Sequence, residues 1–125
     1  MPVVIDSSAL LAFLWGEPGG SVVQSALHSG DALCTVVNWA EVATKVMARG
    51  GDWQAAETAL RGLGLTIVPA TDDDAVAAAR LWLDHPYLSL GDRICLATAL
   101  RLNARVVTAD RIWAQAIPTV ELVRG

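Results

Sequence analysis

Short apolar runs alternate along the chain with longer stretches in which apolar residues recur every three or four positions. The first run, at 3–5, is β-branched and ends on Asp6, and apolar residues then recur at helical spacing over 9–14. Later apolar runs predict further strands at 32–36, 66–68, 105–108 and 120–123. The intervening stretches predict helices over 21–28, 38–49, 53–63, 71–84, 90–103 and 110–116. The chain is therefore predicted to alternate strands with helices.

None of the predicted strands alternates apolar with polar residues. Apolar strands separated by helices indicate a parallel sheet that helices cover on both sides. The stretch 90–103 is apolar almost all round, which predicts a buried helix. With 125 residues the chain has a common size for one domain. We therefore expect a single α/β domain over 1–125, built on a parallel sheet of four to five strands.

The composition excludes several classes of protein. Hydrophobic residues make up 54% of the chain and charged residues 18%, which excludes a disordered chain. The apolar runs are far shorter than the roughly 20 residues that a membrane span needs. The first six residues lack a basic stretch, so we expect no signal peptide, a cytoplasmic location and no membrane partner. Cys34 and Cys95 have no metal-binding spacing and are expected to be buried free thiols.

The net charge of −4, from 9 Lys and Arg against 13 Asp and Glu, argues against a basic nucleic-acid-binding surface. Either nucleic acid is not the substrate, or metal ions supply part of the positive charge. Four acids stand where predicted strands lead into helices, namely Asp6, Glu41, Asp92 and Asp110. Because ligands of open α/β sheets bind beyond the carboxyl ends of the strands, these acids are the candidate site residues.

Each of these acids can also be interpreted as a helix cap. Asn38-x-x-Glu41 and Ser89-x-x-Asp92 have the spacing of a capping box, and Asp6 and Asp110 could be plain N-caps. Acids in a first helical turn gain about 0.3–1 kcal/mol from the helix dipole. Taken singly, each acid therefore remains open to both interpretations. The acidic run at 71–74 is interpreted as a solvated helix start, because no strand leads into it.

Taken together, the four acids favour a metal site. A parallel sheet would bring them to one edge, where like charges raise one another's pKa and a divalent cation would remove the conflict. Oxygen ligands without His or Cys suit Mg²⁺ or Mn²⁺ rather than zinc. Without these four acids, the nine remaining acids equal the nine bases in number, so the net charge of −4 is the charge of the four acids at the site. An ion bound there would let the crevice accept a phosphodiester.

Four segments carry a resemblance to a known family. They are VIDSSAL at 4–10, NWAEV at 38–42, LSLGDR at 88–93 and VTADR-x-W at 107–113. In this order and spacing they resemble the PIN-domain ribonucleases, and most of all the VapC toxins of bacterial toxin–antitoxin pairs. The resemblance implies an α/β/α sandwich and an endoribonuclease that depends on Mg²⁺ or Mn²⁺. It also implies a VapB-type antitoxin and a homodimer of the toxin.

The resemblance assigns the acidic quartet of the family to Asp6, Glu41, Asp92 and Asp110. We expect Asp6 and Asp92 to bind the ion directly, and the other two directly or through water. The ion would activate water for attack at phosphorus and leave a 5′-phosphate and a 3′-hydroxyl. Four further residues complete the prediction: Ser8 and Thr108 as hydroxyls that orient the carboxylates or as ordinary caps, and Arg93 and Arg111 as phosphate contacts or plain surface charges.

Two other kinds of function compete with the nuclease. A phospho-acceptor signalling domain would need an acidic pair after the first strand and a lysine, but Asp6 has no acidic neighbour and Lys45 lies within a helix. A catalytically silent PIN-like binding protein would not need the complete quartet of acids. The face around Trp53 and the helix at 9–15 are the predicted surfaces for a dimer partner or an antitoxin.

Overall fold

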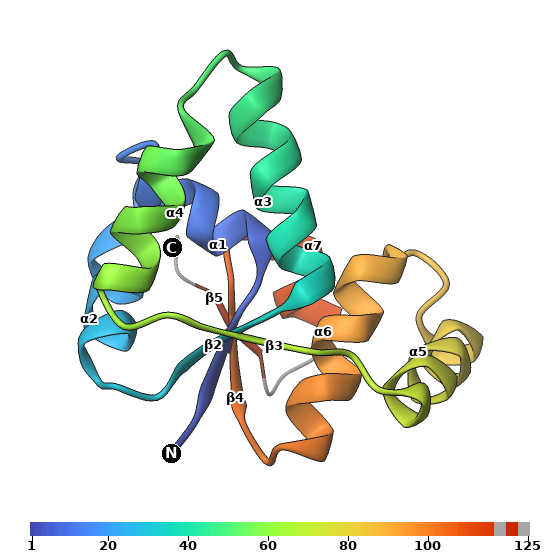
Figure 1. The fold of residues 1–125 in the computed structure, drawn as a ribbon. Helices are drawn as coiled ribbons and strands as arrows, with labels where there is room; N and C mark the ends of the chain where they lie inside the picture. Colours follow the sequence, from blue (N-terminus) through green and yellow to red (C-terminus); the bar gives the residue numbers. More distant parts are fainter. Residues whose placement is uncertain (117–119, 123–125) are drawn as a thin grey trace.

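The computed structural model describes residues 1–116 and 120–122 (Figure 1). Strands and helices alternate along it as the hydrophobic pattern predicts. In chain order they are β1 (Val3–Ile5), α1 (Ser7–Leu14), α2 (Gly20–His28), β2 (Ala32–Thr35), α3 (Val36–Ala48), α4 (Trp53–Gly62), β3 (Thr66–Val68), α5 (Asp72–Asp84), α6 (Leu90–Arg101), β4 (Arg105–Thr108), α7 (Arg111–Ala116) and β5 (Val120–Leu122).

The strands form one five-stranded sheet in the order β3-β2-β1-β4-β5, and every neighbouring pair is parallel. β1 is the central strand, where Val4 pairs with Leu33 on one side and with Val106 on the other. Since all five strands run the same way, their carboxyl ends lie at one edge of the sheet. The predicted parallel sheet is thus confirmed, at the upper end of the expected number of strands.

Successive residues of β1 face opposite layers of helices. Val3 and Ile5 belong to a core that α1, α2, α3 and α4 complete, whereas Val4 belongs to a second core with Cys95 of α6 and Trp113 of α7. This alternation is the usual geometry of a strand, and it makes both faces of the sheet apolar. The result is the expected α/β/α sandwich.

The helix α6 is buried because it lies between the sheet and a further helix. Figure 1 shows α5 outside α6, away from the strands. Ala78 of α5 packs there with Ile94 and Ala97 of α6. Cys34 and Cys95 are buried free thiols, as the sequence predicts. No helix in the described part of the chain is long and apolar enough to cross a bilayer.

One surface prediction is wrong. The helix start at 71–74 is not entirely solvated, because the side chain of Asp74 is buried and bound by Arg101 of α6. A local sequence pattern does not reveal which distant helix covers it. In the predicted partner surface at 9–15, Leu10 and Leu11 are buried in the chain's own core, whereas Phe13, Leu14 and Trp15 are only partly buried.

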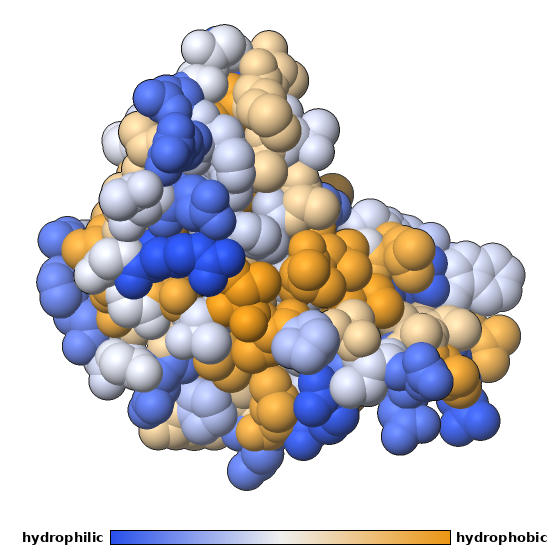
Figure 2. All heavy atoms as spheres, in the orientation of Figure 1, coloured by the Kyte–Doolittle hydropathy of each residue, from blue (hydrophilic) through white to orange (hydrophobic). Residues whose placement is uncertain are grey.

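Apolar side chains also reach the surface on one face. Figure 2 shows an apolar band across the middle of the face that carries β3, with polar surfaces above and below it. Val36 and Leu90, the first residues of α3 and α6, are 46% and 61% exposed. Apolar side chains therefore flank the edge of the sheet at which these two helices begin.

Candidate active site at the carboxyl edge of the sheet

The four predicted acids follow or flank the carboxyl ends of three neighbouring strands. Asp6 directly follows the central strand β1, and Asp110 lies two residues beyond the end of β4. Glu41 lies in α3, which begins immediately after β2, and Asp92 lies in the first turn of α6. Figure 1 shows the starts of α1, α3 and α6 converging above this edge of the sheet. The parallel topology thus gathers acids that are up to about a hundred residues apart in sequence.

Asp6 is the most enclosed of the four acids, with 2% of its surface exposed. It is the N-cap of α1, where its Oδ1 accepts hydrogen bonds from the Ala9 backbone N–H (2.9 Å) and from Ser8 Oγ (2.8 Å). Thr108 Oγ1 donates to Oδ2 from the end of β4. A carboxylate has about four acceptor positions, so these three hydrogen bonds leave room for a cation.

The two predicted hydroxyls both orient Asp6 and are themselves held by the backbone. Ser8 Oγ accepts from the Ala109 N–H at 3.0 Å, and Thr108 Oγ1 accepts from the Asp110 N–H at 3.0 Å. Each hydroxyl therefore links Asp6 to the segment that carries Asp110. The side chain of Asp6 has little freedom to turn away from the edge of the sheet.

Burial raises the pKa of Asp6 to about 7, although its hydrogen bonds from Thr108, Ala9 and Ser8 act in the opposite direction. The charge of Asp92 raises it further. The ion pairs among the described residues do not involve Asp6. A buried carboxylate without a cation is costly, which is the electrostatic condition that favours binding of a positive ion.

Asp92 combines a capping role with the same electrostatic condition. It forms the predicted capping box, in which its backbone N–H donates to Ser89 Oγ (3.1 Å) and its Oδ2 accepts from the Ser89 N–H (3.3 Å). Desolvation raises its pKa against the effect of these hydrogen bonds, and the charges of Asp110 and Glu41 raise it further. Asp92 therefore couples electrostatically to each of the other three acids.

The second predicted capping box, at Asn38 and Glu41, is wrong. Thr35 at the end of β2 is the N-cap of α3, since its hydroxyl accepts from the Asn38 backbone N–H at 3.1 Å. The chain turns from β2 into α3 without a linker, which moves the cap three residues earlier than expected. Asn38 Nδ2 instead donates to Glu41 Oε1 at 2.8 Å. Glu41 therefore has no capping function, and its carboxylate lies beside Gly91 of α6.

Asp110 is the N-cap of the short helix α7. Its Oδ1 accepts from the backbone N–H groups of Ile112 (2.9 Å) and Trp113 (3.3 Å). Three of the four acids thus take part in capping a helix, and the interpretation as capping residues and the interpretation as ligands do not exclude each other. Caps hold these carboxylates at fixed places, and the sheet brings the places together.

The acids form a coupled set rather than a finished coordination sphere. In residues 1–116 and 120–122, no three His, Cys, Asp or Glu side chains already stand as a cage for an ion. The donor set nevertheless fits a hard divalent cation, because every candidate ligand is a carboxylate oxygen. Mg²⁺ in particular keeps several waters and needs only one or two direct carboxylates.

The two predicted phosphate contacts differ in their surroundings. The guanidinium of Arg93 donates to the backbone carbonyls of Ala78 (Nη1, 2.9 Å) and Leu88 (Nε, 3.3 Å), so it braces the loop between α5 and α6. Arg111 is exposed in the first turn of α7, next to Asp110. Of the two residues, Arg111 is exposed, whereas Arg93 is half-buried and its guanidinium is bound by backbone carbonyls.

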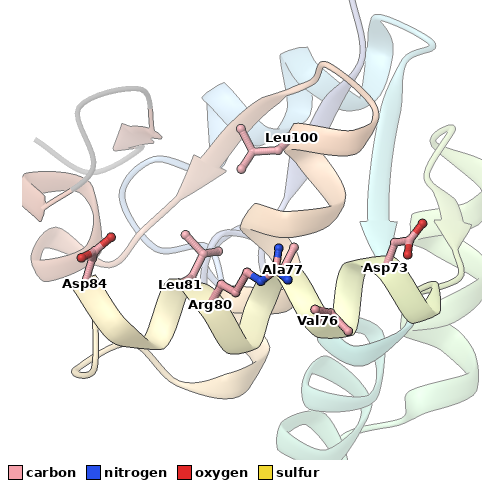
Figure 3. Close-up of a pocket in the computed structure, with 7 residues that line it drawn as sticks. All are labelled: Asp73, Val76, Ala77, Arg80, Leu81, Asp84 and Leu100. Atoms are coloured by element: carbon pink, nitrogen blue, oxygen red, sulfur yellow. The ribbon is translucent and has the colours of Figure 1, made fainter.

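Neither the lysine that a phospho-acceptor domain would use nor the groove beside α5 offers a rival site. Lys45 is in the last turn of α3, four residues after Glu41, and directly follows no strand. A groove of about 570 Å³ lies between α5 and α6, and none of the four acids lines it (Figure 3). Val76, Ala77, Leu81 and Leu100 form its apolar part, with Asp73, Arg80 and Asp84 around them. Because most of these residues are apolar or are not acids, the groove is not an alternative to the cluster of four acids at the edge of the sheet.

Comparisons with known proteins agree with this geometry. The family model described as the PIN domain matches residues 3–117. No curated protein sequence matches this one closely enough to count as a relative.

Solved structures share the fold. A chain of a toxin–antitoxin complex from Klebsiella pneumoniae is 21% identical, with a TM-score of 0.79 and 97% of each chain covered. The sarcin–ricin loop cleaving toxin VapC20 from Mycobacterium tuberculosis is 15% identical, with a TM-score of 0.71 over 91% of this chain and 94% of that one. A chain of VapBC2 from Rickettsia felis, in a complex bound to a promoter DNA fragment, is 15% identical, with a TM-score of 0.71 over 98% and 97%.

Proposed function

Because the chain belongs to the PIN domain family, we propose that it is a metal-dependent endoribonuclease whose active site is the carboxyl edge of the sheet. The observation that carries the proposal is Asp6, a buried carboxylate that pairs with no Lys or Arg among the described residues and is coupled to Asp92. Asp92 is coupled in turn to Glu41 and Asp110. The capping hydrogen bonds of these acids stabilise helices but leave the acids' negative charges unneutralised, which favours binding of a cation.

In this proposal Asp6 and Asp92 bind Mg²⁺ or Mn²⁺ directly, and Glu41 and Asp110 complete the site directly or through water. When bound, the ion supplies activation of water and neutralisation of charge at the phosphoryl oxygens. Ser8 and Thr108 hold the carboxylate of Asp6 in one rotamer. Arg111 stands where a substrate phosphate would approach, whereas the contacts of Arg93 favour a structural role.

The net charge of −4 supports a dependence on the ion as well. Without a bound cation, the acidic edge would repel the phosphates of RNA. With one or two divalent ions, the positive and negative charges of the chain approach balance, and the edge becomes able to accept a phosphodiester. Binding of RNA should therefore require the divalent ion before any cleavage takes place.

The partners form a further part of the proposal. The chain would be the toxin of a type II toxin–antitoxin pair, a cytoplasmic homodimer inhibited by a VapB-type antitoxin. The likeness in fold to chains of toxin–antitoxin complexes supports this part. The exposed side chains of Val36 and Leu90 beside the acids would give an antitoxin an apolar contact next to the site.

The test combines binding of the ion with cleavage. Mn²⁺ should raise the Tm of the purified protein, and a panel of structured RNAs should be cut in Mg²⁺ to products with 5′-phosphate ends. Asp92→Asn should abolish both effects, while Asp73→Asn, which changes an exposed acid in the first turn of α5, should abolish neither. Cleavage at the same rate in EDTA would refute the proposed mechanism.

A further inference from the structure

The carboxylate of Glu41 is fixed by a buried amide. Asn38 is fully buried, and its Nδ2 donates to Glu41 Oε1 at 2.8 Å and to the Gly91 carbonyl oxygen at 3.4 Å. Its Oδ1 accepts from Thr35 Oγ1 at 2.8 Å. Because a carboxylate and a carbonyl oxygen only accept hydrogen bonds, the Nδ2 end of the amide must face Glu41 and Gly91. The Nδ2 group thus connects Glu41 to α6, while Oδ1 is held by the Thr35 hydroxyl.

Gly91 contributes empty space on the other side of the same carboxylate. A Cβ atom at this position would lie 2.6 Å from Glu41 Oε2 and 2.8 Å from Oε1. These distances are far below van der Waals contact, so no residue with a side chain fits while Glu41 keeps its place. The three atoms nearest to this Cβ all belong to the end of the flexible Glu41 side chain. A larger residue at 91 would consequently displace the carboxylate and leave the backbone where it is.

Glu41 needs such a restraint because its neighbour repels it. The charges of Glu41 and Asp92 interact unfavourably, as the effect of Glu41 on the pKa of Asp92 shows. Without a cation, a free glutamate side chain would turn away from Asp92 toward solvent. Capping does not explain Asn38, since Thr35 already caps α3. A buried asparagine inside a helix is instead accounted for by the carboxylate that it holds.

We propose that Asn38 and Gly91 are positioning residues for Glu41: Asn38 supplies the hydrogen bond, and Gly91 supplies the space, that keep its carboxylate beside Asp92. This inference rests on the proposed function, because it treats Glu41 as part of an ion-binding site. Segments of α3 and α6 more than 50 residues apart then act as one unit. The site depends on a glycine that contributes space and a backbone carbonyl but no side chain.

Gly91→Ala tests the need for space. Alanine favours a helix over glycine, so the Tm should stay equal or rise, while Mn²⁺ affinity and the kcat for RNA cleavage fall by about 10-fold or more with KM unchanged. Gly62→Ala is the matched control, because no atom lies within 4 Å of a Cβ at that position of α4. It should gain the same helix preference and keep the wild-type affinity for Mn²⁺.

Asn38→Ala tests the hydrogen bond through a double-mutant cycle. Alone, it should lower Mn²⁺ affinity by about 10-fold. In a Glu41→Ala background, neither Asn38→Ala nor Gly91→Ala should lower Mn²⁺ affinity any further, because the group that they position is gone. A purely structural role would make the losses additive, and additive losses would overturn the inference.

A measurement without metal separates this inference from the proposed function. In the protein labelled with ¹³C at the glutamate Cδ, the Glu41 resonance is identified by its loss in Glu41→Ala. It should move in Asn38→Ala and Gly91→Ala and stay in place in Gly62→Ala. A Glu41 resonance that does not move would overturn the positioning role. So would a Gly91→Ala protein that binds Mn²⁺ as tightly as the wild type, provided that the wild type binds Mn²⁺. If the resonance moves but the wild type neither binds Mn²⁺ nor cuts RNA, the proposed function fails, and the role in ion binding fails with it.

Discussion

The starts of α5 and α6 use the same local motif with opposite electrostatic results. Both helices begin with a capping box, Thr71 with Asp74 in α5 and Ser89 with Asp92 in α6. In each box the hydroxyl accepts from the backbone N–H of the acid, and the acid accepts from the N–H of the cap residue. As local motifs the two boxes are equivalent.

Their surroundings differ completely. Asp74 is 1% exposed and receives both Nε (2.9 Å) and Nη2 (3.0 Å) of Arg101, together with the Thr98 hydroxyl (3.1 Å). The hydrogen bonds from Arg101 lower the pKa of Asp74 to about 2, against the effect of burial. Asp92 meets other acids, and desolvation together with their charges raises its pKa.

This contrast separates acids that hold the fold from acids that are available for chemistry. Arg101 is the cation that neutralises Asp74, and the carboxylate of Asp74 therefore has a structural role. Asp92 and Asp6 lie at the same edge of the sheet, and none of the described Lys and Arg residues forms an ion pair with Asp6. A capping motif therefore reports where a helix starts, and the neighbouring charges decide whether its acid is also a ligand.

The largest expected contrast is in activity. Asp92→Asn should reduce RNA cleavage in Mg²⁺ by more than about a hundredfold, since loss of a ligand exceeds the effect of losing an outer-shell partner. Asp74→Asn should leave the rate per folded molecule unchanged. Single-turnover cleavage below the Tm of both variants measures this, and equal losses in the two would remove the distinction.

The next effect is a pH dependence caused by Asp6. Its pKa of about 7 in the folded state lies above the ordinary value of 3.8, so the folded protein binds the proton more tightly than the unfolded chain. Without metal, the free energy of unfolding should therefore fall by up to about 4 kcal/mol as the pH rises from 4 to 7. Urea titrations of the wild type and Asp6→Asn in EDTA check this, and Asp6→Asn should lack the decline.

The acids of the two capping boxes should also differ in how much they contribute to the free energy of unfolding. Asp74→Asn breaks an ion pair in which only the carboxylate is buried, and should lower the free energy of unfolding by about 2–3 kcal/mol. Asp92→Asn in the metal-free protein should leave it unchanged or raise it, because relief of repulsion offsets the weakened cap. Urea denaturation at neutral pH gives both values. A loss in Asp92→Asn as large as that in Asp74→Asn would show that Asp92 is only a cap.

The smallest effect lies at acid pH and belongs to Asp74. Because its pKa is lowered, it contributes stability at pH values above the ordinary aspartate pKa, and this contribution is lost as the pH falls from about 4 to about 2. The difference corresponds to about 2 kcal/mol. The acid limb of the stability curve should be less steep in Asp74→Asn than in Asp73→Asn, whose acid is exposed.

The alternation of strands and helices could be predicted from the sequence, and so could the positions of Asp6, Glu41 and Asp110 after strands. Asp92 begins a helix that follows α5, so its position at this edge depends on how α6 packs. Hydrophobic period is a local property, and parallel strands place all their carboxyl ends at one edge whatever their order. The prediction that Asp6, Asp92 and Asp110 stand at helix starts holds for the same reason, since a cap is read from three or four neighbouring residues. Asn38 misled the prediction because Thr35, three residues earlier, offers the same type of cap.

Sequence by itself therefore determined the α/β alternation and which acids follow strands. Tertiary structure alone decided that Arg101 reaches Asp74 while no Lys or Arg of the described residues pairs with Asp6, that Arg93 turns to a backbone carbonyl of α5, and that Glu41 rests on Gly91. The contacts that are formed join residues 15 to 50 positions apart. A pattern with a period of two or four residues carries no information about such contacts, because packing of whole helices against the sheet sets them.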